Sequence, residues 1–220
     1  MISDAQDIML QALNMKDALR PRSLQAEIGV SALGSCARRV WFDLNDYPKQ
    51  QETDHLEAIM GTAIHHAIEQ ALTDFSFGAF LIEVEVEYDG LKGHIDWWRP
   101  DRFEIVDWKT MKLKNAGYFP KMGQRWQVHT YGYLQSMMGE RVEQVTLVAL
   151  MRDGNSSKVL THSEPYDLAT AMIALEWLDR VRQAGQPPAP EMDAINFCKP
   201  YCPFFGELCQ GMVKSSKRRW

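Results

Sequence analysis

The chain has 220 residues, of which 45% are hydrophobic and 24% are charged, and its formal net charge is −5. These values are typical of a globular protein and exclude a disordered or fibrous one. The negative balance also argues against a protein that coats DNA in bulk. No apolar run approaches the roughly 18 residues that a membrane span requires. No secretory signal is visible either, so we expect a cytoplasmic protein with no membrane partner.

Hydrophobic periodicity predicts an alternation of helices and strands. Helical spacing of apolar residues predicts helices over residues 3–20, 31–46, 54–75, 124–138 and 168–182. Alternation of apolar and polar residues, bounded by turn signals, predicts strands over residues 80–88, 91–98, 103–110, 142–151 and 158–162. The Asp89–Gly90 pair is a strong hairpin signal between the first two strands. This order predicts a mixed α/β core.

Two charged residues end a strand face that is otherwise apolar. Asp107 and Lys109 are two residues apart and therefore share one face of the strand predicted at 103–110. The tight turn before this strand makes the preceding strand its antiparallel neighbour, which brings Asp96 close to Asp107. Two carboxylates with a lysine suit a Mg²⁺ or Mn²⁺ ion and an activated water. An exposed ion pair at a strand end is the alternative.

A histidine on the helix predicted at 54–75 can face the same sheet. Gly61 and His65 are one turn apart on the border of the apolar stripe, so the glycine leaves the approach to the imidazole open. His66 lies on the other border and has no such gap. We therefore expect His65 rather than His66 to take part in a site, although a lone helical histidine can also be structural.

Four short motifs follow one another along the chain: Gly61-x-x-x-His65, Gly93-x-x-Asp96, Asp107-Trp108-Lys109 and Gln127-x-x-x-Tyr131. In this order and on these elements they resemble the motifs of the PD-(D/E)xK nuclease superfamily, in its RecB-like branch. The resemblance covers about residues 31–209. It implies an α/β fold with a restriction-endonuclease-like core, in which helices flank a central mixed sheet.

The resemblance also implies a role for each motif residue. The implied ligands of a catalytic Mg²⁺ or Mn²⁺ are His65, Asp96, Asp107 and the backbone carbonyl of Trp108. Lys109 would activate the attacking water. Gln127 and Tyr131 would lie beside the metal site and the DNA backbone. From the residues alone, Tyr131 could instead belong to the core, because it shares an apolar helical face with Leu134.

The four cysteines are distributed unevenly. Cys36 stands near the start, whereas Cys198, Cys202 and Cys209 lie within twelve residues of one another near the end. A disulfide framework is not expected in a chain without an export signal. Some RecB-like nucleases of the CRISPR-associated and phage groups bind an iron–sulfur cluster with one N-terminal cysteine and a C-terminal trio. The resemblance therefore implies a 4Fe–4S cluster; zinc or four unrelated buried cysteines are the alternatives.

The resemblance implies one nuclease domain over residues 1–220, with a catalytic core at 54–163. Residues 31–46 and 196–211 would jointly bind the cluster, as an iron–sulfur-stapled helical portion formed by the two ends of the domain. The implied function is a metal-dependent DNA exonuclease that acts in recombination, repair or processing, in a bacterial or phage-infected cell. The alternatives are a non-catalytic DNA-end-binding or adaptor protein and a zinc-stapled endonuclease.

The expected partner is DNA, as single strands or duplex ends, with a homo-oligomer or a recombination protein as further candidates. Trp97 and Trp98 point to opposite faces of a strand, so one belongs to the core and the other could stack on an unpaired base. Candidate phosphate contacts are Arg38, Arg39, Lys112, Lys114 and the cationic tail at 214–220. A solvated surface is the alternative for all of these cations.

Overall fold

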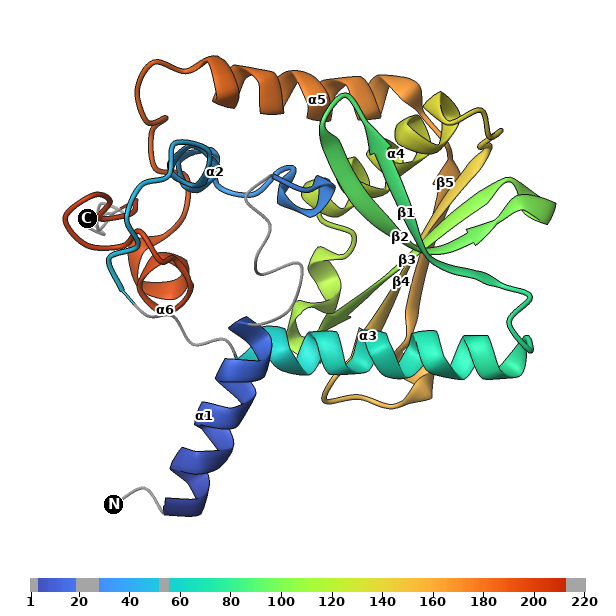
Figure 1. The fold of residues 1–220 in the computed structure, drawn as a ribbon, viewed down its shortest axis with the longest axis horizontal. Helices are drawn as coiled ribbons and strands as arrows, with labels where there is room; N and C mark the ends of the chain where they lie inside the picture. Colours follow the sequence, from blue (N-terminus) through green and yellow to red (C-terminus); the bar gives the residue numbers. More distant parts are fainter. Residues whose placement is uncertain (1–3, 19–27, 52–55, 213–220) are drawn as a thin grey trace, which may run out of the picture. The chain divides into compact units, whose positions relative to one another are not determined.

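The structure, a computed structural model, describes residues 4–18, 28–51 and 56–212 (Figure 1). The chain forms two compact units. Unit 1 comprises Met1–Glu27, Ser35–Ile59 and Arg180–Trp220, and unit 2 comprises Ile28–Gly34 and Met60–Asp179. The predicted cationic tail at 214–220 lies outside the described residues. Among the residues that are described, none of the helices combines the length and apolar character of a membrane span.

A five-stranded mixed sheet of order β1-β2-β3-β4-β5 forms the core of unit 2. Its strands are β1 (Leu81–Tyr88), β2 (Leu91–Arg99), β3 (Glu104–Met111), β4 (Gln144–Met151) and β5 (Leu160–Pro165). Neighbouring strands are antiparallel, except β3 and β4, which are parallel. All five strands agree with those predicted from alternation to within a few residues. The mixed α/β core is therefore confirmed.

Two kinds of connection fix the order of the strands. Asp89 and Gly90 have φ angles of 51° and 73°, which is the left-handed pair that a tight hairpin between β1 and β2 requires. Parallel strands instead need a crossover. Between β3 and β4 the crossover consists of the 3-10 helix η4 (Leu113–Tyr118) and the helix α4 (Met122–Met137).

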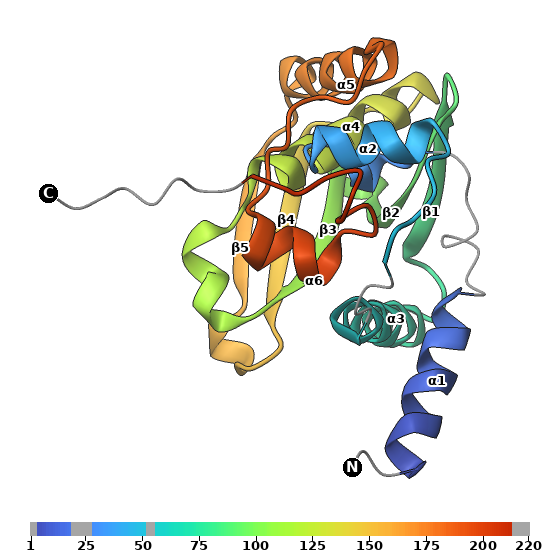
Figure 2. The same cartoon turned by 90° about the vertical axis from the view of Figure 1, so that its left-hand side faces the viewer.

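Helices cover both faces of this sheet. Figure 2 shows α4 and α5 (Leu168–Gln183) on one side of the strands and α3 (Leu56–Phe75) on the other. Helix α4 is buried around most of its circumference, with Val128, Thr130 and Leu134 almost inaccessible to solvent. Helix α5 packs through its small residues Ala171 and Ala174. The three helices agree with the predicted ones.

Strand β2 loses its regular alternation at Asp96. Its buried positions are Leu91, Ile95, Asp96 and Trp98. The ladder between β1 and β2 continues on both sides of Glu83 and Asp96 but does not pair these two residues, and Glu83 has a φ of 51°. The register is the same on both sides of this pair, so neither strand carries an extra residue. The Asp96 carboxylate contacts the backbone of β3, where it accepts a hydrogen bond from the Trp108 amide.

Unit 1 joins segments that are far apart in the sequence. Its helices are α1 (Asp4–Ala18), α2 (Ala37–Leu44) and the short α6 (Lys199–Tyr201), which follows the π-helical turn η6 (Ala194–Cys198). Helix α2 packs on the C-terminal segment, where the rings of Phe42 and Phe204 are 5.1 Å apart. Trp41 Nε1 donates a hydrogen bond of 2.7 Å to the carbonyl of Ala184.

The helix predicted over residues 31–46 is wrong at its start. The structure has a 3-10 turn, η2 (Val30–Ala32), and α2 begins only at Ala37. Gly34 separates the two because its φ is 69°, which no helix accommodates. A Cβ atom on Gly34 would lie 2.7 Å from Gly123 Cα. The break therefore allows two backbones to approach each other closely.

Arg38 does not have the exposed position expected of a phosphate contact. Its guanidinium donates hydrogen bonds to the carbonyls of Pro188 and Leu208, at 3.1 and 3.2 Å. It also lies over the ring of Phe42, at 5.5 Å from the centroid. Arg38 therefore holds the N-terminal and C-terminal segments of unit 1 together.

Candidate functional site

Two buried carboxylates meet where β2 and β3 separate. The side chains of Asp96 and Asp107 belong to residues that are only 4% and 1% exposed. The last antiparallel pair on this side joins Trp97 to Val106, so the ladder stops just before the two acids. Asp96 Oδ2 takes the place of a ladder carbonyl and accepts a hydrogen bond of 2.8 Å from the Trp108 amide. The bond fixes one oxygen of Asp96 and leaves Oδ1 for another partner.

Lys109 completes a charged triad with these acids. Its Nζ lies 2.6 Å from Asp107 Oδ2. Burial raises the pKa of Asp107 to about 6, although the Lys109 ammonium opposes the rise and the Asp96 carboxylate adds to it. Two carboxylates face a single ammonium, so the site has an excess of negative charge in a buried place. Such a charge is costly unless a cation joins it.

The two adjacent histidines of α3 have different surroundings. His65 Nδ1 lies 3.8 Å from Asp96 Oδ1, and the His65 side chain is 23% exposed. His66 is 75% exposed and lies beside Glu69, at 3.6 Å. Gly61 lies one turn before His65, and a Cβ atom there would be 3.2 Å from Thr110 Oγ1. The glycine thus lets α3 approach β3, which brings His65 to the free oxygen of Asp96.

Gln127 and Tyr131 lie inside unit 2 rather than on its surface. Gln127 Nε2 donates a hydrogen bond of 3.0 Å to the Tyr131 hydroxyl, and both residues are buried. The Tyr131 ring lies against Gly93, where an added Cβ atom would be 2.5 Å from Cε1. Tyr131 therefore has the core position that the residues alone allowed for it. Gln127 is buried beside it, and the polar ends of the two side chains are paired to each other.

The tryptophans are also occupied by protein contacts. Trp98 is buried in the core of unit 2. Trp97 is half-buried; its ring lies 4.8 Å from that of Phe80, and the Arg99 guanidinium lies over it at 4.7 Å. Trp98 therefore belongs to the core, whereas stacking of Trp97 on an unpaired base stays a prediction.

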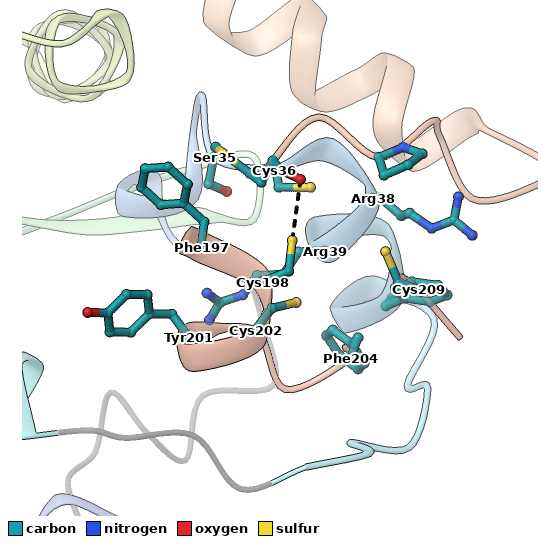
Figure 3. Close-up of a pocket in the computed structure, with 13 residues that line it drawn as sticks. Ser35, Cys36, Arg38, Arg39, Phe197, Cys198, Tyr201, Cys202, Phe204 and Cys209 are labelled. Carbon is teal, nitrogen blue, oxygen red and sulfur yellow. Dashed lines mark hydrogen bonds between the residues drawn. The ribbon is translucent and has the colours of Figure 1, made fainter. Parts of the chain in front are cut away.

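All four cysteines line one cavity of about 170 Å³ within unit 1. Figure 3 shows the sulfur atoms of Cys36, Cys198, Cys202 and Cys209 around this space. Each of them is a free thiol. Cys198 Sγ donates a hydrogen bond to the Met192 carbonyl at 3.5 Å, and the Gly211 amide donates one to Cys209 Sγ at 3.4 Å.

The cavity disfavours negative charge on an isolated thiol. Burial raises the pKa of Cys198 to about 11, and the neighbouring thiols raise it further. Burial also raises the pKa of Cys202, although the Phe204 amide and Arg39 oppose the rise. Among the described residues, no three His, Cys, Asp or Glu side chains are arranged to hold a metal ion as they stand. The cysteines surround a space rather than converge on a point.

Sequence reasoning missed a polar cluster between α4 and β5. Glu164 accepts two hydrogen bonds of 2.7 Å from Arg125 and lies 3.2 Å from His129 Nε2. The Asp167 amide donates to His129 Nδ1 at 3.1 Å, which leaves Nε2 as the protonated nitrogen that donates to Glu164. The hydrogen bonds from Arg125 lower the pKa of Glu164 to about 2. The alternation of His162 and Glu164 along residues 160–165 is the signal that could have revealed this cluster.

Comparisons with known proteins identify the type of fold. Residues 29–210 match the model of the PD-(D/E)XK nuclease superfamily. The crystal structure of SSO0001 superposes with a TM-score of 0.58 at 19% identity, covering 93% of this chain and 96% of that one. A phage related exonuclease from Haemophilus somnus 129PT gives 0.48 at 13% identity, covering 67% and 78%. The alkaline exonuclease from Laribacter hongkongensis gives 0.47 at 8% identity, covering 73% and 90%. A comparison with curated proteins finds no match.

Proposed function

Because the chain belongs to the PD-(D/E)XK nuclease superfamily, we propose that it is a metal-dependent DNA exonuclease with its active site at Asp96, Asp107 and Lys109. The observation that carries this proposal is the buried triad itself. Lys109 Nζ lies 2.6 Å from Asp107, and Asp96 is anchored on the amide of Trp108. A protein that only binds DNA ends has no use for two buried carboxylates near a phosphate, since they would repel it.

The donor set suits a hard divalent cation. Carboxylate and carbonyl oxygens are the ligands that Mg²⁺ and Mn²⁺ prefer, and the triad carries an uncompensated negative charge. The residues that would hold the ion are Asp96, Asp107, His65 and the backbone carbonyl of Trp108. A bound divalent cation would polarise the scissile phosphate and lower the pKa of a water.

Lys109 would act on the water and on the phosphate. The Asp107 carboxylate holds its ammonium in place, so the charge is pre-positioned where negative charge develops during hydrolysis. Gln127 and Tyr131 would act from the core rather than by touching the substrate. Their mutual hydrogen bond and the seat of Tyr131 on Gly93 would keep β2 and α4 in register beside Asp96.

We also propose that Cys36, Cys198, Cys202 and Cys209 bind a 4Fe–4S cluster. Four thiols are the complete ligand set of such a cluster, and here they line a single cavity. Metal binding would convert them to thiolates and so offset the cost that burial imposes on their charge. Zinc is the second candidate, but a tetrahedral zinc needs the sulfur atoms to converge on one point.

Cleavage of defined DNA tests the proposed function. We expect the protein to degrade an end-labelled linear single strand with Mn²⁺ or Mg²⁺ and not with EDTA, and to leave a circular single strand intact. Lys109→Ala should retain DNA binding and lose cleavage by about 100-fold or more. Lys49→Ala, which removes an exposed lysine of unit 1, is the control.

Three outcomes would contradict the proposal. Cleavage of circles would replace the exonuclease with an endonuclease. Binding of DNA ends without degradation under either metal would establish the adaptor function. Full activity of Lys109→Ala would show that the triad is not the active site.

A further inference from the structure

The segment that follows Asp107 carries cations and no acid. Residues 108–139 contain Lys109, Lys112, Lys114, Lys121 and Arg125, and no Asp or Glu. The whole chain has 29 acidic residues in 220, so a segment of this length would hold about four at the average density. A protein with a net charge of −5 therefore keeps one continuous stretch positive, and that stretch begins at the proposed active site.

Three of these lysines are exposed on the loop between β3 and α4. We call residues 112–121 the basic loop. Lys112, Lys114 and Lys121 are all exposed, and the loop also exposes the ring of Tyr118, to 72%. Figure 2 shows the loop in lime green, outside the sheet and beside the turn that joins β4 to β5. Exposed cations alternate here with an exposed aromatic ring.

The loop is held firmly although its charged side chains face solvent. The Leu113 amide donates a hydrogen bond of 2.7 Å to Asp153 Oδ1, and the Arg152 amide donates one of 2.9 Å to the Met111 carbonyl. Ala116 and Phe119 pack against the core cluster of Met111, Ala149 and Met151. The backbone of the loop is thus fixed by its contacts with the core and with the residues after β4, so a ligand would not have to order it. Fixed backbone reduces the entropic cost of binding.

The N-terminus of α4 carries a positively charged side chain, whereas the helix dipole favours a negative one there. Lys121 is the N-cap residue, and the first turn of α4 contains no acid. Helix N-termini carry a partial positive charge and favour acidic side chains. A cation at this position is unfavourable for the free protein and becomes favourable when an anion lies between the loop and the helix.

We propose that the basic loop binds single-stranded DNA next to the scissile phosphate. Lys112, Lys114 and Lys121 contact phosphates, and the Tyr118 ring stacks on an unpaired base. Lys112 follows Lys109 by three residues of extended chain, which is about 10 Å. A strand whose scissile phosphate lies at Lys109 therefore reaches the loop within a few nucleotides. This inference rests on the proposed nuclease function.

Binding measurements on the full-length protein test the loop separately from catalysis. The affinity for a labelled 20-nucleotide thymidine oligomer is measured by anisotropy in EDTA, where no cleavage occurs, at several salt concentrations. The double variant Lys112→Ser/Lys114→Ser is compared with Lys16→Ser/Lys49→Ser, which changes the net charge equally at two exposed lysines of unit 1. The loop variant should lower the salt slope of log K by about 1.4, because each phosphate contact to a single strand contributes about 0.7.

The aromatic contact has its own comparison. Tyr118→Ala should weaken binding of the oligomer by about fivefold or more, whereas Tyr118→Phe should bind as the wild type does. A blunt duplex should lose less affinity than the single strand in Tyr118→Ala, because its bases are already stacked. Thermal unfolding of all variants should match that of the wild type, since the substituted side chains are exposed.

The proposal is overturned if the two double variants lose affinity equally, since binding would then follow net charge alone. It is also overturned if Tyr118→Ala affects the duplex as much as the single strand. Wild-type cleavage of linear DNA, measured in parallel, reports on the nuclease function itself. If the wild type cleaves DNA but the loop variants bind the oligomer as the wild type does, DNA binding by the basic loop is refuted and the nuclease function is kept. If the wild type does not cleave DNA but the loop variants show the expected losses, the nuclease function is refuted and DNA binding by the loop is kept.

Discussion

The missing side chain of Gly93 determines where Tyr131 lies. A Cβ atom at this position would be 2.5 Å from the Tyr131 ring and 3.1 Å from a methyl group of Val30. Both neighbours are buried, so neither can move aside without disturbing the core. The glycine of the Gly93-x-x-Asp96 motif is therefore required for packing.

Gly93→Ala should destabilise the protein by about 1–3 kcal/mol, the usual cost of overpacking a core. Urea unfolding measures this loss. Gly117→Ala is the matched control, because nothing lies within 4 Å of the added Cβ and the φ angle is not positive. Equal stability of the two variants would mean that the Tyr131 ring can move away from Gly93 without cost.

The two histidines of α3 give a second prediction at this scale. His65 lies 3.8 Å from Asp96, whereas His66 points to solvent and Glu69. His65→Ala should lower metal-dependent cleavage by at least roughly tenfold, and His66→Ala should remain active. Cleavage of linear DNA at saturating Mn²⁺ measures both, and equal losses would contradict a role for His65 at the metal site.

The sequence predicted which residues would meet at the site, but it did not predict the backbone geometry that brings them together. Alternation along β3 and the turn before it were enough to bring Asp107, Lys109 and Asp96 together. The irregularity at Asp96 was not predictable, because Glu83 has a positive φ that glutamate rarely adopts. The burial of Tyr131 was left open, since a helical face that carries Gln127 and Leu134 fits either a core or a site.

At the scale of elements, α4 is held on two flanks. On one flank, Gln127 and Tyr131 face β2. On the other, Glu164 of β5 accepts hydrogen bonds from Arg125 and His129, which are one turn apart. A helix gripped at both flanks cannot rotate about its axis. The cluster on β5 therefore fixes the direction in which the opposite flank faces.

Glu164→Gln should lower stability by about 2 kcal/mol at neutral pH, because it removes charge-assisted hydrogen bonds. Its partners lower the pKa of Glu164 to about 2. The carboxylate therefore stabilises the fold fully above its ordinary pKa near 4.5, and the stabilisation is lost as the pH falls towards 2.

Urea unfolding of the wild type and Glu164→Gln at several pH values checks this sign. The difference between the two should not decrease from pH 7 to about pH 5, and it should shrink below pH 4.5. Burial lowers the pKa of His129, and Glu164 opposes this shift. Both proteins should therefore lose stability as the pH falls below about 6.5, and the variant should lose more. A difference that grows below pH 4.5 would refute the assignment to Glu164.

Helices and strands could be predicted where hydrophobic periodicity alone determines them. Their ends could not be predicted where contacts with distant residues set them. The clean spacing of apolar residues in α3 predicted its whole length. The break before α2 depends on the approach of Gly34 to Gly123, two residues that are far apart in the sequence. Periodicity over residues 31–46 reports nothing about such a contact, so the predicted helix ran through it.

At the scale of the molecule, unit 1 is discontinuous. Residues of its N-terminal half bind residues about 150 positions later: Gln51 donates to the carbonyl of Cys202 at 2.8 Å, and the Ala37 amide donates to Glu191 at 3.0 Å. The cysteines repeat this pattern, because Cys36 lies in the N-terminal segment of unit 1 and the other three lie in its C-terminal segment. A cofactor bound to all four would cross-link the two segments.

Cys36→Ser should therefore affect unit 1 more than the chemistry of unit 2. We expect the wild type to be brown, with the broad absorbance at about 400 nm that an iron–sulfur cluster gives. The variant should lose this colour. A loss of about 2 kcal/mol would lower Tm by about 4–8 °C. Cleavage measured well below Tm should persist.

Ser35→Ala, next to Cys36 in the same cavity, should keep both the colour and the Tm. Colourless wild-type protein that carries one zinc per chain would replace the cluster with zinc. Loss of cleavage in Cys36→Ser, at a temperature where the variant is fully folded, would contradict the structural role.

The discontinuity of unit 1 also sets an order of events during translation. Residues 60–179 supply the whole sheet of unit 2, and they leave the ribosome before any residue of the C-terminal segment of unit 1. Until then, Trp41 and Phe42 lack Ala184 and Phe204 as partners, and Cys36 lacks the other three cysteines. A nascent chain can thus hold a finished nuclease sheet before the cysteine cavity exists. Occupancy of that cavity would mark the chains whose synthesis has passed Cys209.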